Sequence, residues 1–567
     1  MIVDGYVDEP TCLGVPPYVS TYPRYLAGAF WTFLPHLEII YQTIDSVRSA
    51  PDVAVSTWSK SDMVVLIAGM IVPGKYLGGT PISPREARHL FSDSRLSQTT
   101  KVLVGPWARF GYALQGGRPA CSPEDLAPLF DYVISGDAEI VIGNALSAGC
   151  SLENVDLTQV RSRPDETEQF ALRGAEIVLQ APGFKIGHLI CEIETFRGCP
   201  RYLTGGCSFC VEPLYGAPMQ RAVEAVVREV ERLYQVGVRA FRIGRQADLF
   251  VYGSKEMGEV EFPRPNAEAV EKLFLGIRRV APDIHVLHID NVNPGTLSRY
   301  PEESRDVARA IMRYHTTGDV AAFGVESADP DVIRRNNLKA TPEEVLDAVR
   351  LLNEVGAKRP PHELPHLLPG LNFVYGLPGE SNRTLEANAN LLERILEEGL
   401  ILRRINIRQL IAFPGTRVAQ QRAGRISHSE FLSHKEYIRR NMDVVFLKRV
   451  APPGTIIRSV FLESREGNYL LMRPLGSYPL LCQMPSHGNA PKTCDVFVVD
   501  HGPRSVSVLP CPIRAREMTL AQWSMIPGVG QKRAARLKRE YPRSVQEAES
   551  IVGIRLPEWL TRWMVFE

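Results

Sequence analysis

The sequence lacks the features that would place the protein in a membrane or outside the cell. None of its apolar runs reaches the roughly 18 residues that a bilayer-spanning segment needs. The first ten residues, MIVDGYVDEP, contain no basic segment followed by a long apolar one, so they do not resemble a secretion signal. Ten cysteines in 567 residues are too few for a disulfide framework. We therefore expect a cytoplasmic protein in a reducing compartment.

A strong charge of either sign is also missing. The 65 Lys and Arg residues nearly balance the 64 Asp and Glu residues, and the formal net charge is +1. This balance gives no global indication of nucleic-acid binding. At 567 residues the chain is too long for a single hydrophobic core. It should divide into about three or four domains.

Residues 1–150 have the pattern of a doubly wound α/β domain. Short apolar runs that end at glycine or another turn residue alternate with helical patterns. The runs are VVLIAG (Val64–Gly69), KVLVGP (Lys101–Pro106) and YVISGD (Tyr132–Asp137). Such runs are typical of buried parallel strands, and any ligand would bind at their carboxyl ends. The polar stretch Leu152–Gln169 predicts a linker or a connecting helix.

A second α/β pattern covers residues 176–420. Its six apolar runs are LICEIETFRG, VRAFRIGRQAD, IHVLHIDNV, VAAFGVES, LNFVYGLPGE and RINIRQLIAFPG. Helical segments such as Arg221–Gln235 and Thr384–Gly399 separate them. Six strand–helix units predict a partial parallel (β/α)6 barrel, open because it has fewer than eight units. Each predicted strand carries polar residues at its C-terminal end, where barrels hold their active sites.

Beyond Thr416 the composition changes. Residues 452–510 alternate apolar and polar residues between turn signals, as in GTIIRSVFLESREGNYLLMRPLG. This alternation predicts a small antiparallel β-barrel. Residues 512–567 are predicted to be helical.

Three cysteines lie close together immediately after the first strand of the predicted barrel. Cys199, Cys207 and Cys210, in FRGCPRYLTGGCSFCVEP, have the spacing C-x7-C-x2-C. Thiolates are preferred ligands of zinc and of iron–sulfur clusters. A structural zinc site needs a fourth ligand with its own local spacing, and none follows closely. The pattern therefore favours a 4Fe–4S cluster with one open iron over three unconnected cysteines.

This loop resembles that of the radical S-adenosylmethionine (radical SAM) enzymes. The resemblance rests on three cysteines after the first strand of a partial barrel, with the aromatic Phe209 before the last one. It implies that S-adenosylmethionine binds the fourth iron and is cleaved reductively to a radical that abstracts hydrogen from the substrate. The usual spacing is C-x3-C-x2-C, so this loop carries four extra residues. We expect the insertion to be tolerated, because the cost of closing a loop rises slowly with its length.

Other strand ends match the same superfamily. GRQAD (Gly244–Asp248), GVES (Gly324–Ser327) and VYGLPGE (Val374–Glu380) lie where members of the superfamily contact the cofactor. The residues that the resemblance assigns to cofactor binding are Gln246, Asp248, Glu326, Ser327 and Arg408. For Arg408 an interior salt bridge is an equally good interpretation.

The whole chain resembles a narrower group, the archaeal radical SAM proteins that end in a helix-hairpin-helix. The segments that carry this resemblance are DGYVDEPTCLGVPPYVSTYPRY, ETFRGCPRYLTGGCSFC, FRIGRQADL, NIRQLIAFPGT, LGSYPLL and IPGVGQKRAARL. The group includes the radical SAM subunit of archaeosine synthase. The resemblance implies a radical lyase that cleaves a C–N bond in the lysine-modified 7-deazaguanine of tRNA to give archaeosine. Its implied partners are tRNA, the lysine-transferring subunit and an external electron donor.

The C-terminal segment contains a possible nucleic-acid-binding site. In MIPGVGQKRAARLKREYP, two glycines form a hairpin that opens a basic helix. Free amide hydrogens at a helix N-terminus and nearby cations attract a phosphate backbone. The predicted nucleic-acid-binding residues are Gly528, Gly530, Lys532, Arg533 and Arg536. The alternative is a packing module with a solvated basic face.

The two remaining domains resemble modules found beside other radical SAM barrels. Residues 452–510 resemble the RNA-binding TRAM barrels of methylthiotransferases, in which Tyr469 and Tyr478 could stack on bases. Residues 1–150 resemble a cobalamin-binding domain. They lack the D-x-H-x-x-G signature that supplies the lower cobalt ligand, so we expect no cobalamin there.

Two other functions stay open. The first is a radical SAM methyltransferase or methylthiotransferase that acts on RNA, which the two flanking domains favour. The sequence lacks both the cobalamin histidine and a second three-cysteine set, and these two absences argue against it. A nucleic-acid-binding protein with a purely structural cluster is weakened by the cofactor-like strand ends.

Overall fold

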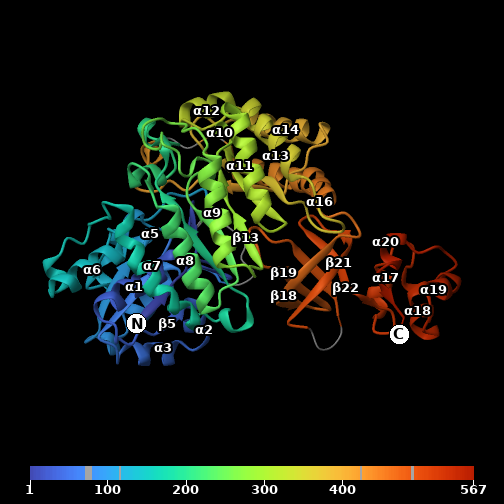
Figure 1. Ribbon diagram of the computed structural model, residues 1–567, viewed down its shortest axis with the longest axis horizontal. Coiled ribbons are helices and arrows are strands. Elements are labelled where there is room, and N and C mark those ends of the chain that lie inside the picture. Colours follow the sequence, from blue (N-terminus) through green and yellow to red (C-terminus); the bar gives the residue numbers. More distant parts are fainter. Residues whose placement is uncertain (71–78, 114–115, 422–423, 425, 487–490, 567) are drawn as a thin grey trace.

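The computed structural model describes residues 1–70, 79–113, 116–421, 424, 426–486 and 491–566. Along the chain it forms an N-terminal parallel sheet, a partial parallel barrel, a small closed β-barrel and a helical tail (Figure 1). The first two parts lie together, and the small barrel and the tail extend to one side. Within the described ranges, no helix combines the length and the apolar character that crossing a bilayer requires.

The N-terminal sheet has five parallel strands in the order β5-β1-β6-β7-β8. The strands are β1 (Ile2–Asp4), β5 (Tyr41–Thr43), β6 (Met63–Ile67), β7 (Thr100–Val104) and β8 (Tyr132–Val133). This is the order of doubly wound sheets in which the second strand lies outside the first. The three predicted strands are therefore confirmed as β6, β7 and β8.

The two faces of this sheet belong to different hydrophobic cores. Val64 and Leu66 face a core that contains Trp58 and Phe91. Val65 and Ile67 face the opposite way, into the core that also fills the partial barrel. Helices α1 (Thr21–Phe33), α6 (Ala138–Ala148) and α7 (Glu168–Arg173) contribute to this second core. The N-terminal sheet and the partial barrel therefore share one hydrophobic core and pack as one structural unit.

The partial barrel contains all six predicted strands. They are β9 (Ile190–Glu194), β12 (Ala240–Arg245), β13 (Val286–Ile289) with its continuation β14 (Asn291–Val292), β15 (Asp319–Glu326), β16 (Leu367–Tyr375) and β17 (Arg404–Gln409). All neighbouring strands pair in parallel. The sequence did not predict the short strand β4 (Tyr18–Val19), which pairs in parallel with β9 and extends the sheet by one strand at that edge.

Helices cover the outside of the barrel, as the apolar periodicity requires. They are α8 (Val223–Val236), α9 (Ala267–Val280), α10 (Pro294–Arg299), α11 (Pro301–Tyr314), α12 (Pro330–Asn336), α13 (Pro342–Gly356) and α14 (Asn382–Glu397). Helix α13 begins at the capping box of Thr341 and Glu344, with a proline at its first position. The predicted helices Arg221–Gln235 and Thr384–Gly399 correspond to α8 and α14. The predicted linker Leu152–Gln169 consists mainly of short 3-10 turns and loops.

A buried ion-pair network joins α1 to the barrel. Glu229 of α8 is fully buried and pairs with Arg24 of α1 and with Arg221, whose Nη1 lies 2.5 Å from Glu229 Oε2. The Tyr25 hydroxyl donates a third hydrogen bond to the same carboxylate. Burial opposes ionisation, but the two guanidiniums outweigh it and lower the pKa of Glu229. The carboxylate therefore stays charged inside the core.

The small barrel is closed, with the strand order β18-β19-β20-β22-β21. Its strands are β18 (Ile456–Glu466), β19 (Tyr469–Pro474), β20 (Leu481–Pro485), β21 (Thr493–His501) and β22 (Ser505–Cys511). The prediction of an antiparallel barrel is wrong at one place, because β20 and β22 pair in parallel. Alternation of apolar and polar residues indicates which side chains face the core, but it does not determine strand direction.

The helical tail packs against the small barrel. It contains α17 (Leu520–Ser524), α18 (Gln531–Glu540), α19 (Val545–Val552) and α20 (Glu558–Thr561), and a two-residue strand pair, β23 (Ile513–Arg514) with β24 (Met564–Val565). Trp559 stacks on Phe497 of the barrel with 5.6 Å between ring centroids. The tail and barrel therefore share a core, which also includes Trp523 and Leu537.

The network around Glu229 provides a test of this fold. Changing Glu229→Ala leaves the buried guanidiniums of Arg24 and Arg221 without a counter-charge, so we expect a loss of about 3–5 kcal/mol in the free energy of unfolding. Denaturant unfolding of the full-length protein measures the loss. The matched change Glu224→Ala, at an exposed position of the same helix, should cost less than about 0.5 kcal/mol. Equal midpoints for the two variants would contradict a structural role for the network.

Candidate functional site

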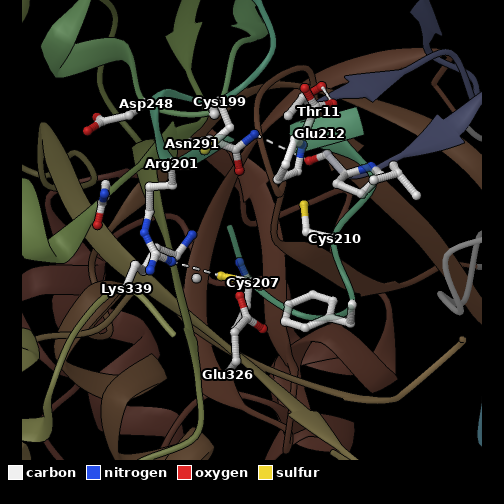
Figure 2. A pocket seen from close by; sticks show the side chains of 18 of the residues that line it. Thr11, Cys199, Arg201, Cys207, Cys210, Glu212, Asp248, Asn291, Glu326 and Lys339 are labelled. Carbon is white, nitrogen blue, oxygen red and sulfur yellow. Dashed lines mark hydrogen bonds between the residues drawn. The ribbon is translucent and has the colours of Figure 1, made fainter. Parts of the chain in front are cut away.

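One pocket opens at the carboxyl ends of the barrel strands. Its wall includes the cysteine loop, the segments that follow β12 and β14, and residues of β15, β16 and β17 (Figure 2). Two further parts of the chain contribute. Pro10 and Thr11 come from the turn between β2 (Asp8–Glu9) and β3 (Cys12–Leu13), and Tyr478 comes from the small barrel. The location matches the sequence-based expectation for a parallel barrel.

The cysteine loop folds around its four extra residues. Pro200–Thr204 form a 3-10 turn, and Gly205 and Gly206 then reverse the chain with φ angles of +76° and +61°. Those angles lie in the left-handed region that glycine tolerates best. Within the turn, the buried Arg201 donates a hydrogen bond from Nη1 to Cys207 Sγ at 3.2 Å. The insertion thus brings a cation against one of the three thiols.

Cys199, Cys207 and Cys210 all line the pocket and surround a common opening (Figure 2). Among the described residues, no three His, Cys, Asp or Glu side chains converge closely enough to hold a single metal ion. A 4Fe–4S cluster fits this arrangement better, because each cysteine binds a different iron and the thiolates lie further apart. Burial raises the pKa of Cys199 to about 12, so this thiol needs a cationic partner such as iron to ionise.

Glu326, at the end of β15, lines the pocket beside Lys339 and Arg408. Its φ of +65° is unusual for a residue other than glycine, and such backbone strain is concentrated at functional sites. A side chain at Gly324 would collide with Lys339 Nζ and with Glu326 Oε1, so glycine allows these groups to approach each other. Burial raises the pKa of Glu326 to about 7, against the opposing effect of Lys339 and then Arg408.

The structure separates the other predicted cofactor-binding residues into two sets. Asp248 lines the pocket, accepts a 2.8 Å hydrogen bond from the Thr296 hydroxyl, and has its pKa raised to about 6 by burial. Gln246 is buried, and its amide group bonds to Thr195 and to the Ile243 carbonyl. Ser327 is also buried, and its hydroxyl accepts a hydrogen bond from the amide of Asp329. Asp248, Glu326 and Arg408 are therefore brought together at the pocket, whereas Gln246 and Ser327 bond within the protein.

Several pocket residues had no signal in the sequence. Lys339 lies in a loop that no motif marks, and Arg201 lies within the cysteine loop but had no assigned role. Thr11 donates a hydrogen bond to Glu212, which links the N-terminal segment to the end of the cysteine loop. The segment DGYVDEPTCLG, which contains Thr11, could have been predicted to contribute to the site. It is one of the segments that carry the resemblance to the narrower family group, but it had no assigned role.

Tyr478 of the small barrel contacts residues of the partial barrel. It lies in the left-handed region with a φ of +54° and donates a 2.6 Å hydrogen bond to Asp290. The neighbouring Ser477 bonds to His288 of β13, with 2.9 Å between Ser477 N and His288 Nδ1. The loop between β19 and β20 therefore enters the partial barrel, where the half-buried Tyr478 forms part of the pocket wall. Tyr469, by contrast, lies on the small barrel and is 49% exposed.

Comparison with known proteins agrees with this geometry. The Radical SAM superfamily profile matches residues 193–392. An uncharacterized protein of Methanocaldococcus jannaschii is 43% identical over 514 residues, which cover 89% of this chain and 92% of that protein. The chain belongs to the radical SAM superfamily. Its cofactors are a 4Fe–4S cluster and S-adenosylmethionine.

More distant similarities concern parts of the chain or the fold alone. A tRNA-2-methylthio-N(6)-dimethylallyladenosine synthase of Ruegeria sp. is 24% identical over 200 residues, 35% of this chain and 39% of that enzyme. A solved radical S-adenosylmethionine methyltransferase, TsrM from Kitasatospora setae, is 16% identical. The matched region covers 73% of this chain and 74% of the TsrM chain, with a TM-score of 0.47.

The residues of the pocket fit both cofactors of this radical SAM enzyme. Cys199, Cys207 and Cys210 would hold the cluster, and Glu326 and Asp248, which line the same pocket, would accept hydrogen bonds from S-adenosylmethionine. When bound, these cofactors supply the one-electron chemistry that generates a substrate radical. The apolar side chains of Phe209, Leu410 and other lining residues would limit the access of water to the bound cofactors.

We expect each of the three cysteines to be required for the cluster. Protein reconstituted without oxygen should bind about four irons and four sulfides per chain, and Cys199→Ala, Cys207→Ala or Cys210→Ala should abolish this binding. Iron analysis and the visible absorption spectrum measure it. Cys150→Ala, at a half-buried position after α6, is the matched control and should keep the full cluster. A reducible cluster retained in Cys199→Ala would exclude ligation across the long loop.

Glu326 should control cofactor affinity and its pH dependence. Because the charged carboxylate is the stronger acceptor, binding of S-adenosylmethionine should strengthen as the pH rises through about 7. Glu326→Gln should weaken binding at pH 8 by about tenfold or more and remove this dependence. Equilibrium dialysis at several pH values measures both effects. The control Glu302→Gln lies on the exposed face of α11, and an equal loss there would exclude a specific role for Glu326.

Proposed function

We propose that this radical SAM enzyme modifies tRNA in the cytoplasm. Its reaction would be the radical cleavage of the C–N bond in the lysine side chain of a lysine-modified 7-deazaguanine, which gives archaeosine. The proposal combines the resemblance of the whole chain to archaeal radical SAM proteins of this type with the chemistry of the pocket. The lysine-transferring subunit of archaeosine synthase would supply the substrate, and an external donor would supply electrons.

The insertion of Tyr478 into the pocket wall is the observation that carries the proposal of an RNA substrate. The loop that bears it belongs to the small barrel, which resembles RNA-binding modules. An RNA held on this barrel would therefore lie next to the site of radical chemistry. The target base would have to leave its stack to enter the pocket, as it does in other enzymes that modify bases.

One acidic group of the pocket, Glu212, favours a cationic substrate. The pocket also holds Glu261, which pairs with Arg201, and Glu326, which lies beside Lys339 and Arg408. Glu212 is 2% exposed, and its Oε2 has no hydrogen-bond partner among the described residues. A buried carboxylate oxygen without a partner is costly, and the ammonium group of a lysine side chain could provide one.

The tail offers a second contact for tRNA. Gly530 caps α18, and Gly528 has a φ of +80°, so a turn precedes the helix. Lys532, Arg533 and Arg536 are exposed, while Leu537 faces the core. In our proposal the exposed basic face and the free amides of the hairpin contact phosphates without reading sequence. The helix-hairpin-helix would thus add affinity rather than specificity.

A methyltransferase or methylthiotransferase reaction on RNA is the second candidate. It is favoured by the similarity of the barrel to the Ruegeria methylthio-transferring enzyme and by the doubly wound N-terminal sheet. The sequence contains no second set of three closely spaced cysteines. Cys12, Cys121 and Cys150 belong to different segments of the N-terminal region. A purely structural cluster is the least favoured function, because it leaves the polar pocket without a purpose.

Mass spectrometry of tRNA nucleosides from cells that lack the protein separates these reactions. Loss of the lyase should remove archaeosine and leave a nucleoside that still carries the mass of lysine. Complementation with the wild-type gene should restore archaeosine, whereas the Cys207→Ala variant should not. Loss of a methyl or methylthio group instead would support the second candidate. An unchanged set of tRNA nucleosides would exclude both.

A further inference from the structure

The residues that lengthen the cysteine loop place a guanidinium in the pocket wall. Pro200–Thr204 form a 3-10 turn of five residues between Cys199 and Cys207. The three residues that usually separate these two cysteines in the superfamily could not contain such a turn. Arg201 lies inside the turn, is 3% exposed and lines the pocket together with both cysteines. The longer spacing therefore changes the composition of the site itself.

Arg201 is held by hydrogen bonds from three of its nitrogen atoms. Nη1 donates to Cys207 Sγ at 3.2 Å, the contact drawn as a dashed line in Figure 2. Nε donates to Glu261 Oε1 at 2.8 Å, and Nη2 donates to Asn337 Oδ1 at 3.1 Å. A guanidinium is rigid and planar, so acceptors on three of its nitrogens fix both its position and its orientation. The contact with the sulfur is therefore a defined feature of the loop.

The loop is also secured by other side chains. Asn337 Nδ2 donates to the Gly206 carbonyl at 3.0 Å and to the Thr204 carbonyl at 3.2 Å. Arg417, which follows β17, donates a hydrogen bond to the same Gly206 carbonyl. These bonds go to the backbone of the loop, whereas Arg201 bonds to the sulfur of a cluster ligand. Fixing the loop is therefore not a sufficient explanation for the contact with Cys207.

A fixed cation against a ligand sulfur changes the energetics of cluster reduction. Reduction adds one electron, and a charge-assisted hydrogen bond to a thiolate stabilises the more negative form of a cluster. Glu261 partly offsets the charge of Arg201. Its carboxylate, however, bonds at Nε and its side chain is 28% exposed, while that of Arg201 is 4% exposed. Water therefore screens the carboxylate more than the guanidinium, and the cation dominates at the sulfur.

We propose that Arg201 raises the reduction potential of the 4Fe–4S cluster held by Cys199, Cys207 and Cys210. One electron passes from the external donor to the cluster, and the hydrogen bond from Arg201 lets a weaker donor supply it. Arg201 acts on this step through Cys207 and does not contact the substrate. The inference depends on the cluster and is independent of the proposed RNA substrate. The insertion in the cysteine loop would thus serve the redox chemistry rather than merely be tolerated.

The reduction potential of the reconstituted full-length protein tests this role. In Arg201→Gln the sulfur loses its cationic donor. The ratio of reduced to oxidised cluster at the wild-type midpoint should then fall about three- to tenfold, a shift of up to about 59 mV towards more negative potential. Electron paramagnetic resonance of the reduced cluster at a series of fixed potentials, without oxygen, measures the ratio. Iron and sulfide analysis first establishes that the variant holds a full cluster.

The matched control is Arg417→Gln. It removes an exposed cation that bonds to the backbone of the same loop, and it should keep the wild-type midpoint. An equal shift in this control would show that loosening of the loop is the cause, and the role of Arg201 would be rejected. An unchanged midpoint in Arg201→Gln with a full cluster would also overturn it.

A second variant keeps the proposal testable if Arg201→Gln holds no cluster. Arg201→Lys retains the charge, but an ammonium cannot reproduce the three fixed hydrogen bonds of the guanidinium. Its midpoint should shift in the same direction as that of Arg201→Gln, by a smaller amount. A midpoint equal to or above the wild-type value in Arg201→Lys would reject the proposal.

Discussion

Buried pairs of arginine and carboxylate hold the first two parts of the molecule in one arrangement. Arg245 of β12 bonds to Glu194 of β9 and to Glu9 of the N-terminal hairpin, and Arg161 pairs with the same Glu194. Neither partner of such a pair can move away alone, because the remaining charge would stay buried without compensation. The N-terminal hairpin is thereby held against the barrel, and the rest of the pocket depends on this position.

The pocket is consequently built by three parts of the chain. The partial barrel provides the cysteine loop and the strand ends, and the N-terminal hairpin provides Thr11, which bonds to Glu212. The small barrel provides Tyr478 through a loop that enters the partial barrel. The small barrel thus forms part of the wall of the pocket. This arrangement would couple the binding of a substrate on the small barrel to the geometry of the pocket.

The absence of counter-charges is as informative as their presence. Arg242 and Arg245 are neutralised within the protein and serve the fold. Arg404 and Arg439, in contrast, lie near other arginines and stay unpaired within the described ranges. Asp443 is an acidic residue that acts on both, and burial raises its pKa to about 6.

Local patterns in the sequence determined most of the architecture and the centre of the site. Apolar runs that end in glycine identified six barrel strands and three strands of the N-terminal sheet, because burial on both faces leaves a continuous apolar signature. The spacing of Cys199, Cys207 and Cys210 identified the cluster loop, since three thiols must converge within a short segment. Only the tertiary structure brought Thr11, Lys339 and Tyr478 to the pocket, because these contacts join residues far apart in the chain. It also decided the parallel pairing of β20 with β22, which depends on neighbours that no local pattern records.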